Sequence, residues 1–182
     1  MDALIIVDMQ NDFVYGSLAN PAAQAIVEPI AEFIKNFDGK IIATLDTHYD
    51  NYLATQEGKF LPIPHCIFGS EGHNMVSVLD NAITSKNRSG FPKIFKKSFG
   101  CDRWKDIKAI EGMDRFILVG TCTDICVISN ALILKAFYPE KEVIVLEDLC
   151  AGLTEEKHKA ALEVMKSCQV IVKNSKEWKS ND

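Results

Sequence analysis

The fold follows most directly from residues 116–126, which read Phe-Ile-Leu-Val-Gly-Thr-Cys-Thr-Asp-Ile-Cys. The first four, Phe116 to Val119, form an apolar run without polar alternation, which is typical of a strand buried on both faces of a parallel sheet. Gly120 and small polar residues then lead into a helical stretch, residues 124–137, for which Thr123 is the expected N-cap. The sequence therefore predicts a strand, a turn and a helix in direct succession, as in an α/β protein.

The same alternation continues along the chain. Runs rich in Ile, Val and Leu predict five more strands, at residues 3–7, 40–45, 93–95, 143–146 and 170–172. Helical stretches lie between them, at residues 21–37, 102–109 and 154–167. We therefore expect an α/β fold with an open, doubly wound, mostly parallel sheet, Rossmann-like in its three layers, with helices on both faces.

Length and composition set the class of protein. The 182 residues, 47% of them hydrophobic, allow one sizeable core but not two ordinary domains, so we expect a single domain over residues 1–182. A net charge of −5 without a basic cluster disfavours nucleic-acid binding, and the apolar runs are far shorter than the ~20 residues of a membrane helix. Because no secretory signal is visible, we expect a cytoplasmic protein with reduced cysteines. The sequence does not determine whether the protein forms a homo-oligomer.

One segment interrupts the alternation. Residues 46–92 contain no strong strand and at most a short helix near residues 75–83, yet they carry three of the four histidines. An irregular segment of this length in a compact domain is usually either functional or disordered. Its content of His, Asp and Pro favours function.

Reactive side chains follow several of the predicted strands, at the edge where open α/β sheets bind ligands. Asp8 follows the first strand, Lys96 the strand at residues 93–95, and Cys122 and Cys126 the strand at residues 116–119. Each alone is most simply a polar or small residue at a strand end, but together they favour a site. Cys126 is the predicted nucleophile, because a helix N-terminus and a nearby cation lower the pKa of a thiol. The alternative is that both cysteines are small buried hydrophobic residues.

The chemistry of such a site can be sketched from the same residues. The turn would direct the backbone N–H groups of Cys122 and Cys126 to one point, where they can stabilise an oxyanion. No histidine is placed to act as the base for the thiol, so Asp8 would serve, provided that a low-dielectric site raises its pKa. Lys96 is the expected lysine, although Lys97 beside it leaves the register open by one residue.

The irregular segment holds a second group of candidate residues. Asp46 and His48 are two residues apart on an extended stretch, so their side chains project to the same side, and Glu57 and His65 follow. Two histidines with carboxylates suit Zn²⁺, Fe²⁺ or Mn²⁺. The alternative is a set of loop residues that contact the backbone, and the spacing alone does not decide between the two.

Taken together, three motifs resemble the isochorismatase-like cysteine hydrolases, and within them the nicotinamidase/pyrazinamidase branch. The motifs are Asp8-Met-Gln-Asn-Asp-Phe13, Lys96 followed by Phe99 and Gly100, and Gly120-Thr-Cys-Thr-Asp-Ile-Cys-Val127. The resemblance covers nearly the whole chain, and the order and spacing of the motifs make it specific. It implies a catalytic triad of Asp8, Lys96 and Cys126, and a non-prolyl cis peptide before Cys122 that helps to shape the oxyanion hole.

The resemblance also implies a metal centre. Asp46, His48 and His65 match metal ligands of the nicotinamidases, and Glu57 falls where some members place a fourth ligand. The implied cofactor is one divalent transition ion, zinc in the first place and otherwise iron or manganese.

The implied reaction is hydrolysis of a small amide through a thioester, with nicotinamide as the expected substrate. Phe13 is the candidate wall for the pyridine ring, whereas residues 60–63, Phe-Leu-Pro-Ile, lack the aromatic wall of the best-known nicotinamidases near Leu61 and Pro62, which predicts a raised KM. Another C–N hydrolase with a carbamoyl or ureido substrate is the first alternative. A non-catalytic binding protein, or a thiol redox protein that uses Cys122 and Cys126, is less well supported, because the cysteine spacing is not CxxC.

Overall fold

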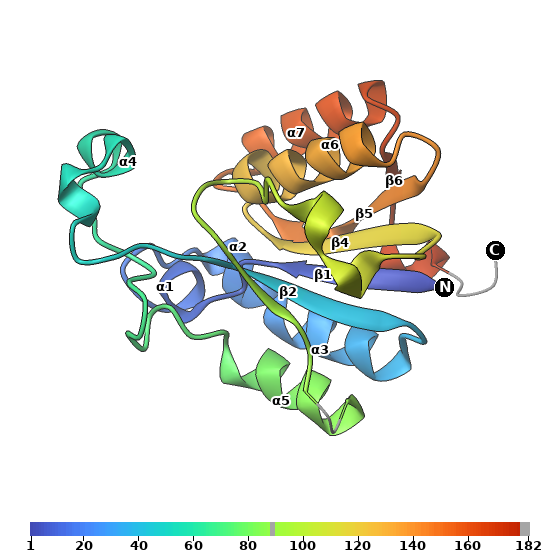
Figure 1. Ribbon diagram of the computed structural model, residues 1–182, viewed down its shortest axis with the longest axis horizontal. Helices are drawn as coiled ribbons and strands as arrows, with labels where there is room; N and C mark the ends of the chain where they lie inside the picture. Colours follow the sequence, from blue (N-terminus) through green and yellow to red (C-terminus); the bar gives the residue numbers. More distant parts are fainter. Residues whose placement is uncertain (88–89, 179–182) are drawn as a thin grey trace.

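The computed structural model describes residues 1–87 and 90–178 and contains a six-stranded sheet. The strands are β1 (Asp2–Val7), β2 (Lys40–Asp46), β3 (Lys93–Lys96), β4 (Arg115–Thr121), β5 (Glu142–Ala151) and β6 (Ile171–Lys173). Every neighbouring pair is parallel, and the order is β3-β2-β1-β4-β5-β6 (Figure 1). The expected parallel sheet is therefore confirmed. The last four residues of the predicted domain lie outside the described part of the chain.

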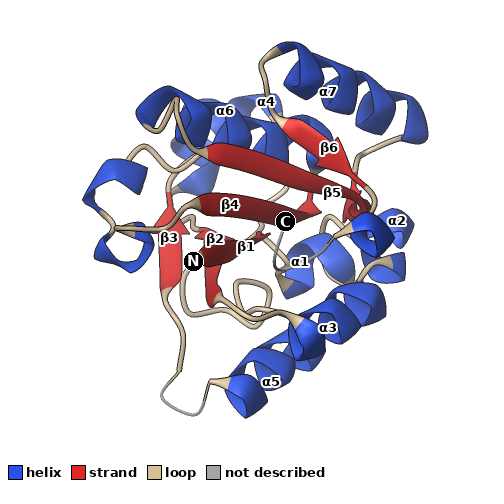
Figure 2. Ribbon diagram, turned by 90° about the vertical axis from the view of Figure 1, so that its right-hand side faces the viewer, coloured by secondary structure: helices blue, strands red, loops and turns tan. Residues whose placement is uncertain are grey.

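Helices cover both faces of the sheet, which gives the expected three layers (Figure 2). One face carries α2 (Pro21–Ala25), α3 (Val27–Asn36) and α5 (Ser77–Lys86), and the other carries α6 (Ile128–Phe137) and α7 (Glu155–Ser167). The central strand β1 serves both layers: Leu4 and Ile6 pack under α3 and α5, while Ile5 points to the opposite face. A strand buried on both faces has to be continuously apolar, as its sequence is.

Two predicted helices differ from the structure. The stretch 21–37 is divided at Ile26 into α2 and α3, because Pro29 cannot donate a backbone hydrogen bond and its ring obstructs the carbonyl of Ala25, where α2 ends. Residues 102–109 form two short 3₁₀ turns instead of one helix. Their buried Trp104 and the apolar residues after it recur every three positions, which is the period of a 3₁₀ turn.

The carboxyl ends of four strands meet at one edge of the sheet, at the left of Figure 1. There the chain forms α1 (Asn11–Val14), which the sequence analysis did not predict. Within the irregular segment 46–92 it also forms a 3₁₀ turn (Tyr52–Ala54) and α4 (Gln56–Phe60). From β1 the chain adds β2 and then β3 on one side of the sheet, and it then crosses to the other side of β1 to form β4. The order of the strands therefore reverses between β1 and β4. Open α/β sheets bind ligands at such a switch point.

Gly120 brings two of these strand ends together. Its φ is +120°, and a Cβ at this position would lie 2.2 Å from the carbonyl oxygen of Val7. Only glycine allows β4 to approach β1 so closely. The chain after β4 therefore begins beside the end of β1, where Asp8 lies.

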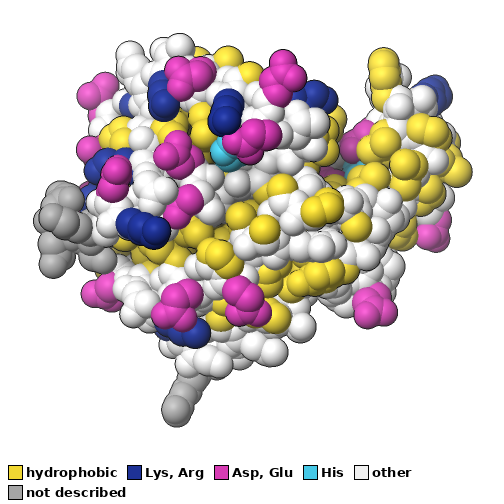
Figure 3. All heavy atoms as spheres, turned by 180° about the vertical axis from the view of Figure 1, so that it is seen from behind, with side chains coloured by type: hydrophobic (Ala, Val, Ile, Leu, Met, Phe, Trp, Pro, Cys, Tyr) yellow, Lys and Arg dark blue, Asp and Glu magenta, His cyan; other side chains and the backbone are white. Residues whose placement is uncertain are grey.

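The region around α4 forms a lobe with an apolar surface. Seen from behind, hydrophobic side chains gather on this lobe, which is at the right of Figure 3. Phe60 is 82% exposed, and Leu53 and Ile63 are also exposed. Within the described residues, no helix is both long and apolar enough to cross a membrane.

Candidate active site

Asp8 lies at the end of β1 and is completely buried. Its φ of +49° turns the chain out of the strand. The carboxylate accepts a hydrogen bond from Thr44 Oγ1 at 2.7 Å through Oδ1, and its Oδ2 lies 2.7 Å from Lys96 Nζ. Burial raises the pKa of Asp8 above its ordinary value, and the charge of Lys96 opposes part of that rise.

Lys96 is the last residue of β3 and is only 2% exposed. Besides Asp8, its ammonium group contacts the carbonyl oxygen of Ser98 at 2.9 Å and Cys126 Sγ at 3.7 Å. Lys97 is exposed, because adjacent residues of an extended chain point to opposite sides. The structure therefore brings Lys96, and not Lys97, together with Asp8 and Cys126.

Cys126 lies in a turn of π-helix, Thr123–Val127, which we call the Cys126 turn. The expectation of a lowered thiol pKa is wrong. Burial raises the pKa of Cys126 well above its usual range, the negative charge of Asp8 adds to the rise, and the charge of Lys96 opposes it. The resting group is thus a neutral thiol, and it needs a base to become a nucleophile.

Backbone hydrogen bonds define the shape of the Cys126 turn. The peptide bond between Thr121 and Cys122 is cis, as the resemblance implied. The carbonyl oxygen of Cys122 accepts from the N–H groups of Ile125 and Val127 at 3.1 and 3.0 Å. The N–H groups of Cys122, just before this turn, and of Cys126, within it, are the two donors that the sequence analysis selected for an oxyanion.

The N-terminal boundary of this turn differs from the prediction. Cys122 occupies the N-cap position and makes no capping hydrogen bond through its side chain. Thr123, the expected cap, instead places its Oγ1 2.8 Å from His158 Nδ1. The prediction was wrong because the capping rules apply to α-helices, and this segment begins with a wider π-turn.

A second group of side chains lies next to the first. Asp46 ends β2, and the structure gathers His48, His65 and Glu57 around it. Asp46 Oδ2 lies 3.0 Å from His48 Nε2 and 3.5 Å from His65 Nε2, and Glu57 Oε1 lies 3.6 and 3.8 Å from the same two nitrogens. All four donor atoms are within 4.8 Å of one another. Glu57 is the most exposed of the four, with 23% of its side chain accessible.

The donor set of this group fits a divalent transition ion. Two imidazole nitrogens and two carboxylate oxygens are ligands that Zn²⁺, Fe²⁺ and Mn²⁺ accept. His65 Nδ1 lies 2.9 Å from the carbonyl oxygen of Ile63, a contact that leaves Nε2 directed at the carboxylates. Although burial opposes ionisation, hydrogen bonds from His48 and His65 hold the pKa of Asp46 below its usual range. Asp46 is therefore already in the anionic form that a metal requires.

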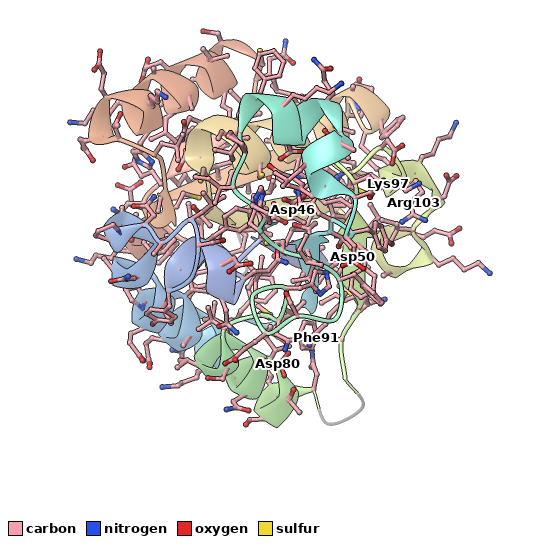
Figure 4. All side chains as sticks on the ribbon, turned by 90° about the vertical axis from the view of Figure 1, so that its left-hand side faces the viewer. Asp46, Asp50, Asp80, Phe91, Lys97 and Arg103 are labelled. Carbon is pink, nitrogen blue, oxygen red and sulfur yellow. The ribbon has the colours of Figure 1, made fainter. Side chains whose placement is uncertain are left out.

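Asp46 joins the two groups. One carboxylate oxygen, Oδ2, faces the histidines, and the other, Oδ1, lies 3.3 Å from Lys96 Nζ. The backbone of Asp46 is held on both sides by Gln10, whose Oε1 accepts from its N–H at 2.7 Å and whose Nε2 donates to its carbonyl oxygen at 2.9 Å. Figure 4 views this edge of the sheet, with Asp46 near its centre and Lys97 toward the periphery.

The surroundings of the metal-type group offer aromatic surface. The ring of Phe13 lies 5.5 Å from the ring of His65. A hollow of about 680 Å³ opens onto His48 and Glu57 and is lined in part by Phe60 and Phe99. The sequence prediction of a missing aromatic wall near Leu61 and Pro62 did not anticipate that Phe99 would line this hollow.

Three buried polar side chains support the site although the sequence analysis did not select them. They are Thr44, Gln10 and Asn130. The Nδ2 of Asn130 donates to the carbonyl oxygen of Cys126 at 2.8 Å, and its Oδ1 accepts from Trp104 Nε1 at 2.9 Å. Thr44 and Asn130 each interrupt an apolar stretch of their strand or helix. That interruption is a signal that could have identified them, because a buried polar group needs partners.

Comparisons with known proteins agree with this geometry. The family model described as the isochorismatase domain matches residues 2–177. The nicotinamidase/pyrazinamidase of Mycobacterium tuberculosis is 31% identical over 185 residues, which cover 93% of this chain and 97% of the relative.

Solved structures give the same result. The pyrazinamidase of Pyrococcus horikoshii in complex with zinc matches with a TM-score of 0.77 at 29% identity, over 95% of this chain and 98% of that one. PnC1 from L. infantum in complex with nicotinate matches with a TM-score of 0.82 at 25% identity, over 97% and 93% of the two chains. Because the family model spans nearly the whole chain, the protein belongs to the isochorismatase family.

Proposed function

We propose that this protein is an amide hydrolase that converts nicotinamide to nicotinate and ammonia, with Cys126 as the nucleophile. The observation that carries the proposal is the position of Lys96 Nζ, which lies 2.7 Å from Asp8 and 3.7 Å from Cys126 Sγ in a buried site. A binding protein would have no need of a buried acid, cation and thiol in mutual contact. The relatives support the substrate, since one is named a nicotinamidase/pyrazinamidase and another was solved with nicotinate.

In the first half of the reaction, Asp8 takes the proton of the Cys126 thiol, and the sulfur attacks the amide carbonyl carbon. The backbone N–H groups of Cys122 and Cys126 stabilise the oxyanion of the tetrahedral intermediate. Asp8 then returns the proton to the departing nitrogen, the C–N bond breaks, and ammonia leaves behind a thioester. The raised pKa of Asp8 suits it to hold this proton between the two steps.

In the second half, Asp8 takes a proton from water, and the resulting hydroxide attacks the thioester carbonyl. The C–S bond breaks, the proton on Asp8 returns to the sulfur, and the nicotinic acid that leaves loses its own proton to solvent to give nicotinate. Throughout, Lys96 stays protonated and holds Asp8 in place. Burial alone would lower the pKa of Lys96, but the negative charges of Asp8 and its neighbours raise it.

Asp46, His48, His65 and Glu57 would hold one divalent ion, for which zinc is the proposal because the Pyrococcus relative was solved with it. When bound, the ion supplies a Lewis acid that can take up the pyridine nitrogen or a water molecule. Phe13, beside His65, would stack on the ring and contribute about 0.5–1.5 kcal/mol beyond area burial. We propose that residues 1–182 form one domain, which contains all of these groups.

The test is ammonia release by the purified protein from a panel of amides. Nicotinamide is expected to be hydrolysed, with a KM above that of the nicotinamidases that have an aromatic wall near the positions of Leu61 and Pro62. Benzamide, which lacks the ring nitrogen, is expected to be the poorer substrate. Background turnover of nicotinamide alongside clear hydrolysis of a ureido or carbamoyl compound would instead support another C–N hydrolase of the family.

A further inference from the structure

The start of α7 is bound to the Cys126 turn at two consecutive residues. Thr123 Oγ1 and His158 Nδ1 are 2.8 Å apart, and Asp124 Oδ1 accepts a hydrogen bond from the N–H of Leu153 at 2.9 Å. Thr123 is completely buried, while His158 is partly buried. Neither side chain has a part in the reaction proposed above.

His158 has little freedom at this contact. Thr154 caps α7 by accepting from the N–H of Lys157 at 3.2 Å, which fixes the first turn of the helix where His158 lies. The chain before it packs closely at Gly152: a Cβ there would lie 2.8 Å from His158 Cβ and 3.1 Å from Asp124 Oδ1. A hollow of about 300 Å³ also adjoins His158, so the imidazole is supported by the helix cap and by Gly152 and is not enclosed on every side.

Thr123 in turn sets the position of Cys126. It is the first residue of the Cys126 turn, and its carbonyl oxygen accepts from the N–H of Ile128, which begins α6. At the other end, Asn130 holds the carbonyl oxygen of Cys126. Cys126 therefore lies between two anchors, and a shift of Thr123 would move both its sulfur and its N–H group.

We propose that His158 is a positioning residue that acts through Thr123 to hold Cys126 and its backbone N–H in the reactive arrangement. This inference rests on the proposed role of Cys126 as the nucleophile. The competing explanation is that His158 only packs α7 against the turn. In that case its size would matter, and the nitrogen at the Nδ1 position would not.

Three substitutions of His158 separate these explanations. His158→Ala removes the contact, and its kcat is expected to fall at least about tenfold with little change in KM, since small displacements of a reacting group are costly. His158→Asn keeps a polar atom near the position of Nδ1 and should retain most of the activity. His158→Gln places its amide nearer the position of Nε2 and should behave like His158→Ala, although it is larger than asparagine.

Changes at Thr123 give an independent test from the other side of the contact. Thr123→Ser keeps the hydroxyl and should retain activity, whereas Thr123→Val keeps the shape, loses the hydroxyl and should resemble His158→Ala. The double variant His158→Ala with Thr123→Val should be no slower than the single variants, because both remove the same interaction. These variants also decide the matter if His158→Ala does not fold.

The rate at which iodoacetamide alkylates Cys126, located by mass spectrometry, provides a readout without substrate. If the wild-type protein does not hydrolyse nicotinamide, the proposed function fails, while the alkylation rates of the same variants still test the positioning role. The expected result is slower alkylation in His158→Ala and Thr123→Val than in His158→Asn and Thr123→Ser. Wild-type kcat and alkylation in His158→Ala, or equal losses in His158→Asn and His158→Ala, would overturn the inference.

Discussion

Lys96 is buried, and its charge is stabilised by oxygen atoms of three residues around its ammonium group, in addition to the contact with Cys126. Asp8 and Asp46 face it with negative charge, and the carbonyl oxygen of Ser98 accepts a further hydrogen bond. A buried ion that loses its partner is strongly destabilising, because the remaining charge is left without compensation. We therefore expect Lys96 to contribute to stability as well as to the proposed reaction.

Substituting Lys96 and Lys97 one at a time distinguishes the effects of the buried cation from those of losing an exposed cation. Lys96→Ala should slow nicotinamide hydrolysis by at least about 10²-fold, because Asp8 loses the cation that positions it. The free energy of unfolding should also fall by about 3–5 kcal/mol in urea denaturation. Lys97→Ala, which removes an exposed cation, is the matched control and should leave both quantities nearly unchanged. The reverse pattern would assign the role to Lys97.

The pH dependence of kcat/KM should show the raised pKa of Asp8. The proposed base acts only when ionised, so kcat/KM should fall as the pH drops through the pKa of Asp8. Because burial raises that pKa, the acid limb should lie above the ordinary value of 3.8. Metal content measured at each pH distinguishes this limb from loss of an ion. An acid limb at or below the ordinary value, with metal retained, would contradict the assignment.

The positions of the three candidate catalytic residues could be predicted from the sequence, because the topology of the sheet determines them. Asp8 follows β1, Lys96 ends β3 and Cys126 lies in the turn after β4, so their meeting at one edge follows from the common direction of the strands. The raised pKa of Cys126 was not predictable, because it depends on how completely the folded chain excludes water. Asn130 could have been selected, because it interrupts an apolar helical stretch and lies four residues after Cys126, whose carbonyl oxygen accepts its hydrogen bond.

Among the elements, β4 and the turn after it determine the geometry of the site. The pairing of β4 with β5 is irregular between Leu118 and Gly120. Gly120 then lies directly beside Val7, at the end of β1. A side chain there would have to displace backbone and not a flexible side chain. The position of the Cys126 turn relative to Asp8 thus depends on one glycine.

Gly120→Ala should lower the free energy of unfolding by at least about 1–3 kcal/mol, through both its φ and the close contact with Val7. Gly112→Ala is the matched control, since Gly112 has a φ of +75° but a Cβ there would meet no atom within 4 Å. Urea denaturation of both variants measures the difference. Equal losses would mean that φ alone, and not the contact with β1, requires glycine at position 120.

The elements that could not be predicted share a physical reason. The strands were found because they are continuous apolar runs, and the long helices because they lie between those runs and are long enough to show a helical pattern. The division at Ile26 depended on the effect of Pro29 on a carbonyl four residues earlier, and α1 and α4 are too short to show a period. These short helices are held by contacts at the carboxyl edge of the sheet. For example, the N–H of Asp12 in α1 donates to the carbonyl oxygen of Gly72 at 3.1 Å.

On the scale of the whole molecule, the switch point of the sheet brings two chemical groups together, and Asp46 contacts both. The segment 46–92 contributes His48, Glu57 and His65 from outside the regular sheet. A third histidine of this segment, His73, lies apart from the group and places its Nε2 3.0 Å from Thr47 Oγ1. The segment was expected to be functional, and the two histidines beside Asp46 are consistent with that interpretation.

The purified protein should contain about one divalent transition ion per chain. Metal analysis should show reduced content in His48→Ala and in His65→Ala, because each loses one of the four donors. His73→Ala is the control and should keep the wild-type content. Undiminished metal in both ligand variants would refute the site.

The identity of the nucleophile can be tested by the rate of nicotinate formation from nicotinamide by three proteins: the wild type, Cys126→Ala and Cys122→Ala. Cys126→Ala should be slower than the wild type by at least about 10³-fold, because no other group can form the covalent intermediate. Cys122→Ala should be much less affected, since the proposed reaction uses only its backbone N–H. An inactive Cys122→Ala protein together with an active Cys126→Ala protein would show that Cys126 is not the nucleophile.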